Sequence, residues 1–217
     1  MTNQELFSYV DHTLLKPEAT PEQIAALCAE AAEHGTASVC VNGSYVALAK
    51  KLLDGKAKVC AVIGFPLGAM PTAAKAFEAA EAIRDGADEI DMVIHIGQLK
   101  AGNIDYVLED IKAVKAAIGD HILKVIIETC LLTEEEKITM CRLVTESGAE
   151  YIKTSTGFST GGATFDDVRL FVEHVGEGVK IKAAGGIRSR EDMEEFLRLG
   201  ASRLGTSSAV KILCGKN

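Results

Sequence analysis

Two lysines lie inside strand-like segments that run into glycine-bearing loops: Lys153 in YIKTSTGF and Lys182 in VKIKAAGGIR. The interior of a strand normally excludes lysine, because removing the ammonium charge from water costs free energy. A lysine held there is either paired within the structure or kept partly neutral as a nucleophile. A neutral lysine amine attacks carbonyl carbon, so the pattern indicates imine chemistry.

Short β-branched segments alternate along the chain with amphipathic segments, which predicts an α/β fold with a parallel sheet. Helix starts are marked by Thr20 with Gln23, Thr133 with Glu136, and Ser189 with Asp192. Helix ends are marked by glycines 35, 86, 148 and 200. The expected strands cover residues 10–14, 37–42, 58–64, 89–95, 123–129, 151–157, 179–185 and 203–207. Eight strands close a (β/α)8 barrel, and nothing resembling a linker interrupts it, so residues 1–217 are predicted to form one domain with a short N-terminal helix.

Residues on a barrel strand point alternately to the interior and to the helix layer. In EIDMVIH (89–95) the apolar residues Ile90, Met92 and Ile94 face the helices, which leaves Asp91 as an interior carboxylate. The same parity predicts charged groups of both signs inside the barrel. The residues predicted to face inward are Asp11, Thr13, Glu89, Asp91, Val93, His95, Lys124, Ile126, Glu128, Lys153, Ser155, Lys180 and Lys182.

Two interpretations of these interior charges remain open at this point. In one, Asp91, Lys124 and Lys182 form a buried ion network that only fixes the register of the strands. In the other, Lys153 is a nucleophile, Lys182 is the charge that lowers its pKa, and Asp91 carries protons. A lysine with the usual pKa of about 10.4 is neutral in only about one molecule in two thousand at neutral pH. Lowering that pKa by about three units requires roughly 4 kcal/mol, which burial and a second lysine can supply.

Glycine-bearing loops follow the last three predicted strands, at the face where barrel enzymes hold their sites. Glycines at strand ends are more often turn residues than phosphate ligands, but three such loops together favour a phosphate site. Arg188 could add a charge to this site or cap a neighbouring helix. These loops contain Gly157, Gly185, Gly186, Arg188, Gly205 and Ser207, and the helix after Ser207 would point its dipole at the anion.

Composition and charge narrow the class of partner. The formal net charge of -8 and the lack of a basic run argue against nucleic acid or a membrane surface, and favour a small molecule. Six scattered cysteines without a C-x-x-C pair indicate reduced thiols and a cytoplasmic location. Five histidines show no ligand spacing, so no metal is expected, and His95 alone among them is predicted to face the site.

The chain resembles deoxyribose-phosphate aldolase, a family of class I aldolases with the TIM-barrel fold. Family-like segments occur in family order over nearly the whole sequence, and the segment that carries Lys153 is the most specific of them. The segments are DHTLL (11–15), SVCVN (38–42), VIGFP (62–66), EIDMV (89–93), KVIIET (124–129), KTSTGF (153–158), KAAGGIR (182–188) and GTS (205–207).

The resemblance implies reversible cleavage of 2-deoxy-D-ribose 5-phosphate to D-glyceraldehyde 3-phosphate and acetaldehyde, in the catabolism of deoxyribose phosphates. It implies an imine on Lys153 with no metal and no cofactor, and a homodimer. It gives Asp91 and Lys182 the roles described above, and Asp11, Thr13 and Lys124 a supporting role around substrate hydroxyls or the proton network. The phosphate contacts that it implies are the six residues named above.

Three features depart from the family pattern. His95 stands where many relatives have asparagine, Ala184 replaces a common serine, and the sequence ends CGKN (214–217) without the tyrosine found in some relatives. The resemblance therefore leaves open how the final proton transfer is made. The alternative functions are another Schiff-base aldolase or a transaldolase, and a sugar-phosphate-binding barrel without chemistry.

Overall fold

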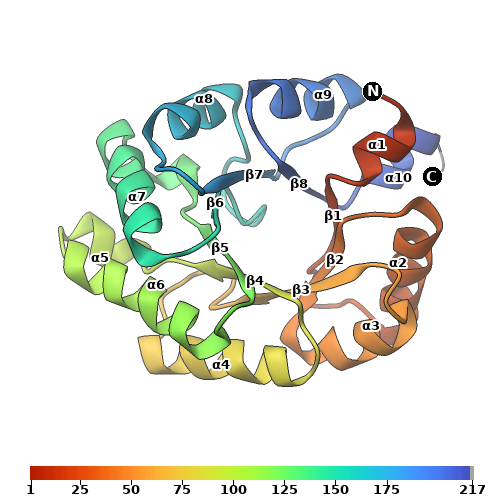
Figure 1. Cartoon of the computed structure of the whole chain (residues 1–217), viewed down its shortest axis with the longest axis horizontal. Coiled ribbons are helices and arrows are strands. Elements are labelled where there is room, and N and C mark those ends of the chain that lie inside the picture. Colours follow the sequence, from red (N-terminus) through yellow and green to blue (C-terminus); the bar gives the residue numbers. More distant parts are fainter. Residues whose placement is uncertain (216–217) are drawn as a thin grey trace.

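The computed structural model describes residues 1–215 as a closed barrel of eight parallel strands, paired in chain order from β1 to β8 and back to β1. Helices surround the barrel on the outside (Figure 1). The strands are β1 Val10–Leu14, β2 Ser38–Asn42, β3 Lys58–Ile63, β4 Glu89–Val93, β5 Ile122–Ile126, β6 Tyr151–Lys153, β7 Lys180–Ala184 and β8 Arg203–Thr206. The predicted (β/α)8 fold is therefore confirmed, and each predicted strand is present.

The helices follow the strands in alternation, with α1 as the predicted short N-terminal helix. They are α1 Asn3–Phe7, α2 Pro21–His34, α3 Val46–Leu53, α4 Thr72–Arg84, α5 Ile96–Lys100, α6 Ile104–Ile118, α7 Glu134–Ser147, α8 Phe165–His174, α9 Arg190–Leu199 and α10 Ala209–Cys214. Two 3-10 turns, η1 Gly43–Tyr45 and η2 Thr129–Leu131, complete the elements. Helix α1 lies beside α10 (Figure 1), and Asn3 Nδ2 donates to Leu213 O at 2.8 Å.

The predicted helix boundaries depend on local chemistry, and the structure confirms them. Thr20, Thr133 and Ser189 each accept a hydrogen bond from the backbone three residues later, and the residue there returns the bond. These capping boxes satisfy N–H groups that a helix start leaves without partners. Gly35, Gly148 and Gly200 end their helices with a left-handed backbone that a side chain would strain.

Strand parity divides the buried residues into two layers. Ile90, Met92 and their counterparts on the other strands pack against the helices in one continuous hydrophobic core. Burial of one such side chain contributes about 1.5–3 kcal/mol. A small separate cluster lies inside the barrel, with Cys40, Cys60 and Val62. The rest of the interior carries charged side chains instead of a full set of aliphatic layers.

All six cysteines are free thiols in the described part of the chain. No helix within residues 1–215 has the length and apolar character needed to cross a bilayer.

Candidate active site

Seven charged side chains from six strands meet inside the barrel, and we call them the interior cluster. All are buried, and the most exposed of them retains 8% of its accessible surface. They are Asp11 on β1, Glu89 and Asp91 on β4, Lys124 on β5, Lys153 on β6, Lys182 on β7 and Arg203 on β8. Neighbouring strands place Asp91 beside Lys124 and Lys153 beside Lys182, and barrel closure brings these pairs together with the others.

Asp91 is the centre of the interior cluster. Its Oδ1 accepts a hydrogen bond from Lys124 Nζ at 2.8 Å, and its Oδ2 accepts from Lys153 Nζ and from Lys182 Nζ, both at 2.7 Å. The expected pairing of Asp91 with Lys182 is present, and the same oxygen also holds Lys153. One carboxylate thus joins all three interior lysines and can exchange protons with each of them.

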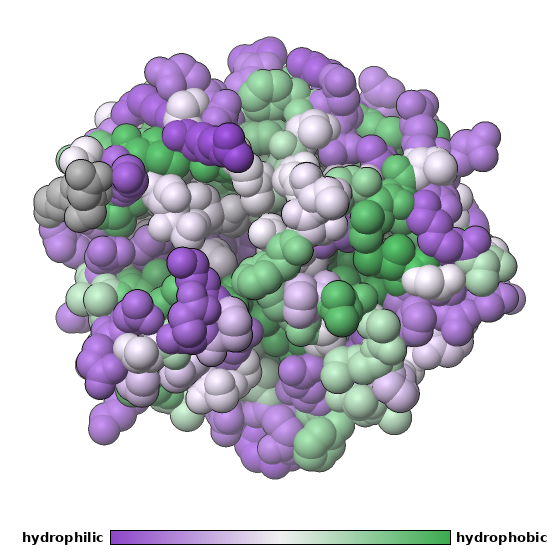
Figure 2. Space-filling view, turned by 180° about the vertical axis from the view of Figure 1, so that it is seen from behind, coloured by the Kyte–Doolittle hydropathy of each residue, from purple (hydrophilic) through white to green (hydrophobic). Residues whose placement is uncertain are grey.

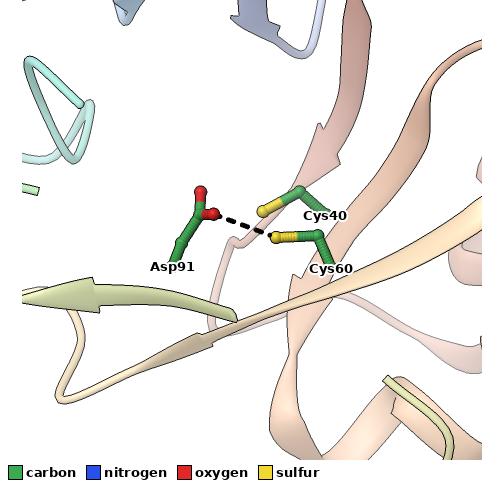
Figure 3. Close-up of side chains that lie close together, drawn as sticks. All are labelled: Cys40, Cys60 and Asp91. Carbon is green, nitrogen blue, oxygen red and sulfur yellow. Dashed lines mark hydrogen bonds between the residues drawn. The ribbon is translucent and has the colours of Figure 1, made fainter. Parts of the chain in front are cut away.

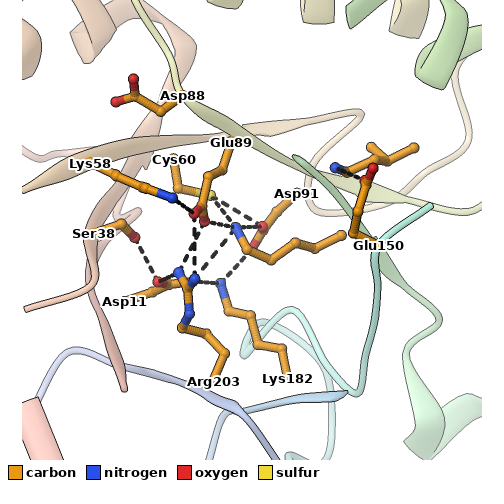
Figure 4. A network of polar contacts seen from close by, with 12 residues as sticks. Asp11, Ser38, Lys58, Cys60, Asp88, Glu89, Asp91, Glu150, Lys182 and Arg203 are labelled. Atoms are coloured by element: carbon orange, nitrogen blue, oxygen red, sulfur yellow. Dashed lines mark hydrogen bonds and ion pairs between the residues drawn. The ribbon is translucent and has the colours of Figure 1, made fainter. Parts of the chain in front are cut away.

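Asp11 and Glu89 provide further carboxylate contacts to Lys124 and Lys182, and they also bind Arg203 (Figure 4). Asp11 Oδ2 accepts from Lys182, while Asp11 Oδ1 accepts from Arg203 Nη1 at 2.6 Å and from Ser38 Oγ at 2.7 Å. Glu89 Oε2 lies 2.6 Å from Lys124 Nζ and 3.0 Å from Arg203 Nη1. Every buried carboxylate in the cluster is therefore paired with at least two cations.

These contacts determine the ionisation of the cluster. Burial alone would raise the pKa of Asp91, but the charges of Lys124, Lys153 and Lys182 hold it well below its ordinary value. Burial alone would lower the pKa of Lys182, but Asp11 and Asp91 raise it above its ordinary value, and carboxylates act on Lys124 in the same direction. Lys182 and Lys124 are consequently charged at neutral pH, which suits the predicted use of Lys182 as a fixed positive charge.

A pocket of about 470 Å³ lies at the carboxyl ends of the strands, above the cluster. Lys153 is the one member of the cluster that lines it, and the other members lie beneath. Thr13 lines it as well, beside the end of β1. On the side of the molecule seen in Figure 2, residues of intermediate hydropathy border a hollow near the centre. The pocket thus opens the amine of Lys153, and no other amine of the cluster, to a small molecule.

The predicted phosphate residues all reach this pocket: Gly157, Gly185, Gly186, Arg188, Gly205 and Ser207. Gly185 and Gly186 have φ angles of 78° and 75°, so their loop needs glycine. The Arg188 guanidinium makes no ion pair within residues 1–215 and is free to meet an anion. Helix α10 spans only six residues, so the expected contribution of its dipole is small.

Gly205 has a second function that the sequence did not reveal. A Cβ atom there would lie 2.9 Å from Ala184 Cβ and 3.2 Å from Lys182 Cε. A side chain at this position would push Lys182 from its place between the two carboxylates.

A buried carboxylate fixes the loop that follows Lys153. Glu128 accepts hydrogen bonds from the Thr156 hydroxyl and from the Thr156 amide, the latter at 3.2 Å. Thr156 Oγ1 in turn accepts from the amide of Phe158 at 3.0 Å. Glu128 has φ 56°, an unusual backbone for a residue other than glycine, and these bonds hold it there.

His95 and Lys180 were predicted to face the interior, and the structure separates their outcomes. β4 ends at Val93, so parity no longer orients His95; its Nδ1 accepts from the Gln98 amide at the start of α5, and its ring packs edge-on against Tyr106. The prediction was wrong for His95 because alternation holds only within the length of the strand. Lys180 is the first residue of β7 and shares strand parity with Lys182, but it lies at the opposite mouth of the barrel and is exposed.

The structure adds two residues that the sequence reasoning missed. Arg203 shares strand parity with Gly205 and Ser207, and that parity could have revealed it. Lys16 lines the pocket beyond the end of β1, is exposed, and makes no ion pair in the described part of the chain. No pattern in the sequence distinguished Lys16 from other exposed lysines.

Three buried side chains inside the barrel bring possible metal-ligand atoms close together. Cys40, Cys60 and Asp91 offer ligand atoms within 4.8 Å of one another (Figure 3). Cys60 Sγ donates a hydrogen bond to Asp91 Oδ1 at 3.1 Å and accepts one from Lys124 Nζ at 3.2 Å. A cation would have to displace ammonium groups from Asp91, so this donor set suits lysines better than a metal ion.

Known proteins share both the sequence and the fold. The family model described as DeoC/LacD family aldolase matches residues 6–217. Deoxyribose-phosphate aldolase of Streptococcus suis (strain 98HAH33) is 59% identical over 212 residues, 97% of this chain and 96% of that protein. The enzyme of that name from Clostridioides difficile (strain 630) is 56% identical, with 97% and 96% covered. The tetrameric structure of deoxyribose phosphate aldolase from Aeropyrum pernix superposes with a TM-score of 0.89 at 32% identity, covering 99% of this chain and 92% of that one.

Proposed function

The chain belongs to the DeoC/LacD family of aldolases, and from this membership we propose that it cleaves 2-deoxy-D-ribose 5-phosphate reversibly to D-glyceraldehyde 3-phosphate and acetaldehyde. It is an aldolase, and so a carbon–carbon lyase. The observation that carries the proposal is the placement of Lys153, whose amine is held by Asp91 and opens to a pocket bordered by glycine loops and an unpaired arginine.

The reaction begins at the aldehyde carbon C1 of the open-chain sugar. The neutral Lys153 amine adds to C1, and the resulting carbinolamine loses water to give a protonated imine. Loss of the proton from the C3 hydroxyl then breaks the C2–C3 bond, whose electron pair moves into the imine to form an enamine. C3 becomes the aldehyde carbon of glyceraldehyde 3-phosphate. The enamine takes a proton at C2, and water releases acetaldehyde and the free lysine.

Asp91 and Lys182 support the proton transfers of this cycle. Asp91 contacts Lys153 directly and can pass protons during carbinolamine dehydration. Lys182 remains charged and shares Asp91 Oδ2 with Lys153, so its positive charge disfavours a second ammonium at the same oxygen. Asp11 and Lys124 position these groups from below, and Thr13 is placed to meet a substrate hydroxyl at the pocket wall.

The phosphate binds at the opposite end of the pocket from the reacting carbon. Backbone N–H groups of Gly157, Gly185, Gly186 and Gly205 approach it closely, with Ser207 and the Arg188 guanidinium as further donors. These contacts orient the sugar with its aldehyde toward Lys153.

Four broader properties are part of the same proposal: one domain over residues 1–217, a cytoplasmic location, a homodimer, and turnover without metal or cofactor. The continuous barrel supports the first, and the free cysteines agree with the second. Mass photometry would measure the oligomeric state, and assays after chelation would test for metal. The open question of the final proton transfer, raised by the sequence end without a tyrosine, concerns residues 216–217, which lie outside the described residues.

Borohydride trapping tests the mechanism directly. The protein is incubated with 2-deoxyribose 5-phosphate, reduced, digested and mapped by mass spectrometry, with Lys153→Met as the control. We expect a two-carbon adduct on Lys153, because cleavage leaves acetaldehyde on the amine. An adduct on Lys182 would reverse the two roles. A larger adduct formed only with other donors would indicate a transaldolase or another Schiff-base aldolase.

If the sugar phosphate binds but no adduct forms, the remaining interpretation is a sugar-phosphate-binding barrel that catalyses no reaction. Isothermal titration with the same sugar phosphate supplies this second readout. The two measurements together separate failure of binding from failure of chemistry.

A further inference from the structure

Among the cations of the interior cluster, Arg203 is separated from Lys153 by the largest number of intervening contacts. Its Nη1 donates to Asp11 Oδ1 at 2.6 Å and to Glu89 Oε2 at 3.0 Å, and Nη2 lies 3.4 Å from Glu89 Oε1. It does not line the pocket, and it pairs with Lys182 in the ladder between β7 and β8. Its side chain is nevertheless nearly buried, with 10% of its surface exposed.

The charges of the cluster do not balance when all members are ionised. The three carboxylates Asp11, Glu89 and Asp91 face four cations, Lys124, Lys153, Lys182 and Arg203, which leaves one positive charge in excess. A buried excess charge is costly, and a buried group relieves it by changing its protonation. Arginine cannot release its proton in a protein, so the relief must come from a lysine or a thiol of the interior.

Contacts with carboxylates indicate which lysine releases the proton. Lys124 lies within 4.0 Å of three carboxylates, at 2.6, 2.8 and 3.7 Å, and Lys182 contacts two. Lys153 contacts one carboxylate oxygen, and shares it with Lys182. Lys153 therefore has the fewest carboxylate contacts of the three lysines, and it is the one that lines the pocket.

The other ionisable groups that the structure describes around the cluster form no ion pair with its lysines. Lys58 lies 3.5 Å from Glu89, but 55% of its side chain is exposed, so water screens its charge. Glu128 is buried after β5 and accepts hydrogen bonds from Thr156. The Cys60 thiol donates to Asp91, and burial raises its pKa well above the ordinary value, while the hydrogen bond with Cys60 lowers the pKa of the Cys40 thiol. The Tyr151 ring lies 5.6 Å from the Arg203 guanidinium and 5.8 Å from the amine of exposed Lys180.

We propose that Arg203 is a positioning residue that keeps the Lys153 amine free of its proton, by occupying Asp11 and Glu89 with a permanent positive charge. With Arg203 present, the cluster is neutral when Lys153 is neutral. Without it, three lysines would balance three carboxylates, and Lys153 would retain its proton. This inference rests on the proposed function of Lys153 as the imine-forming residue.

The test is the pH dependence of kcat/KM for cleavage of 2-deoxyribose 5-phosphate, followed between pH 5 and 10. Arg203→Met removes a cation, so the acidic limb of the profile should move upward by about one pH unit. Glu89→Gln removes an anion, so the same limb should move downward by a similar amount. Arg203→Lys keeps the charge and should leave the limb near its wild-type position.

The opposite signs separate a charge effect from structural damage. Uniform loss of activity in Arg203→Met, with the limb unmoved, would overturn the inference, as would shifts of the same sign in Arg203→Met and Glu89→Gln. If Arg203→Met does not fold, the downward shift expected for Glu89→Gln decides alone. Circular dichroism and the melting temperature establish folding for each variant.

Trapping at each pH distinguishes the inference from the proposed function. A wild-type protein that gives no adduct on Lys153 at any pH would refute the proposed function itself. A wild-type adduct on Lys153 whose pH dependence is the same in all three variants would refute the role of Arg203 alone.

Discussion

The molecule buries lysine in two places, with different outcomes. In the interior cluster, Lys153 shares Asp91 with two other lysines beneath a pocket. In the helix layer, Lys75 of α4 contacts Asp110 of α6 at 2.6 Å, and both side chains are fully buried. The second pair is complete: Lys75 also donates to Val93 O at 2.9 Å, and Thr72 Oγ1 donates to Asp110 at 2.8 Å.

The two buried lysines differ in their charged partners and in their access to the pocket. Burial lowers the pKa of Lys75, with Asp110 opposing the shift, and this amine has one carboxylate of its own and no opening to the pocket. Lys153 shares its carboxylate with other lysines and lines the pocket. If Lys153 is the nucleophile that we propose, charged partners and pocket access, and not burial alone, set it apart from Lys75.

The largest difference is expected when the lysine at each of the two sites is replaced by methionine. Lys153→Met should reduce kcat by about 10⁴-fold or more, because no imine can form. The variant should fold, since the remaining cations and carboxylates of the cluster balance. Lys75→Met, per folded molecule, should keep kcat within a factor of about two. Steady-state assays on matched folded fractions measure both, and comparable losses in the two variants would contradict the distinction.

Stability should show the reverse order. Lys75→Met leaves Asp110 buried without its cation, so the free energy of unfolding should fall by about 3–5 kcal/mol. Adding Asp110→Leu should recover most of that loss, because no uncompensated charge remains. Urea denaturation measures these values. Lys112→Met serves as a control at an exposed pair with Glu109 and should cost less than about 1 kcal/mol. A loss that the second substitution does not recover would show that packing, and not charge, dominates.

A third lysine tests the effect of a pocket-lining side chain that is not buried. Lys16 lines the pocket but is exposed, so Lys16→Met should raise KM for the phosphorylated sugar by about tenfold and change kcat little. KM for unphosphorylated 2-deoxyribose should stay the same if the charge acts on the phosphate. Lys51→Met, at an exposed lysine of α3 outside the pocket, provides the matched control. Equal changes with both sugars would remove Lys16 from phosphate binding.

The smallest effect is the alkaline dependence of stability. The pKa of Lys75 is lowered from about 10.5, so just below that pH the unfolded chain holds more protons than the folded one, and stability rises with pH. The cost of Lys75→Met should therefore grow between pH 8 and 10, by less than about 1 kcal/mol. The pKa of Lys182 is raised, so its contribution is fully present below about 10.5 and is lost only above. Urea denaturation of the wild type and Lys75→Met at pH 7, 9 and 10 would check the sign for Lys75, and a cost of Lys75→Met that falls with pH would contradict it.

Particular residues show how far the sequence could be used. Alternation within EIDMV predicted the interior position of Asp91, and the same rule placed Lys124, Lys153 and Lys182 with it. The rule failed at His95, which lies beyond the end of β4, and it did not show that Lys180, at the first position of β7, would be exposed. It could not show that Lys75, inside an amphipathic helix, is also fully buried, since that depends on which helices pack together.

The sequence by itself determined the barrel, its strand faces and eight of the seventeen residues that line the pocket, because strand parity, capping boxes and glycine positions act over a few neighbouring residues. The tertiary structure alone decided the partners of each charge. Arg203 and Asp11 are 192 positions apart, and Lys182 and Asp91 are 91 apart. Their contacts exist only when β8 pairs with β1 and closes the barrel. Charge balance in the interior is a property of that closure, because Coulomb interactions depend on distance in space and not on spacing along the chain.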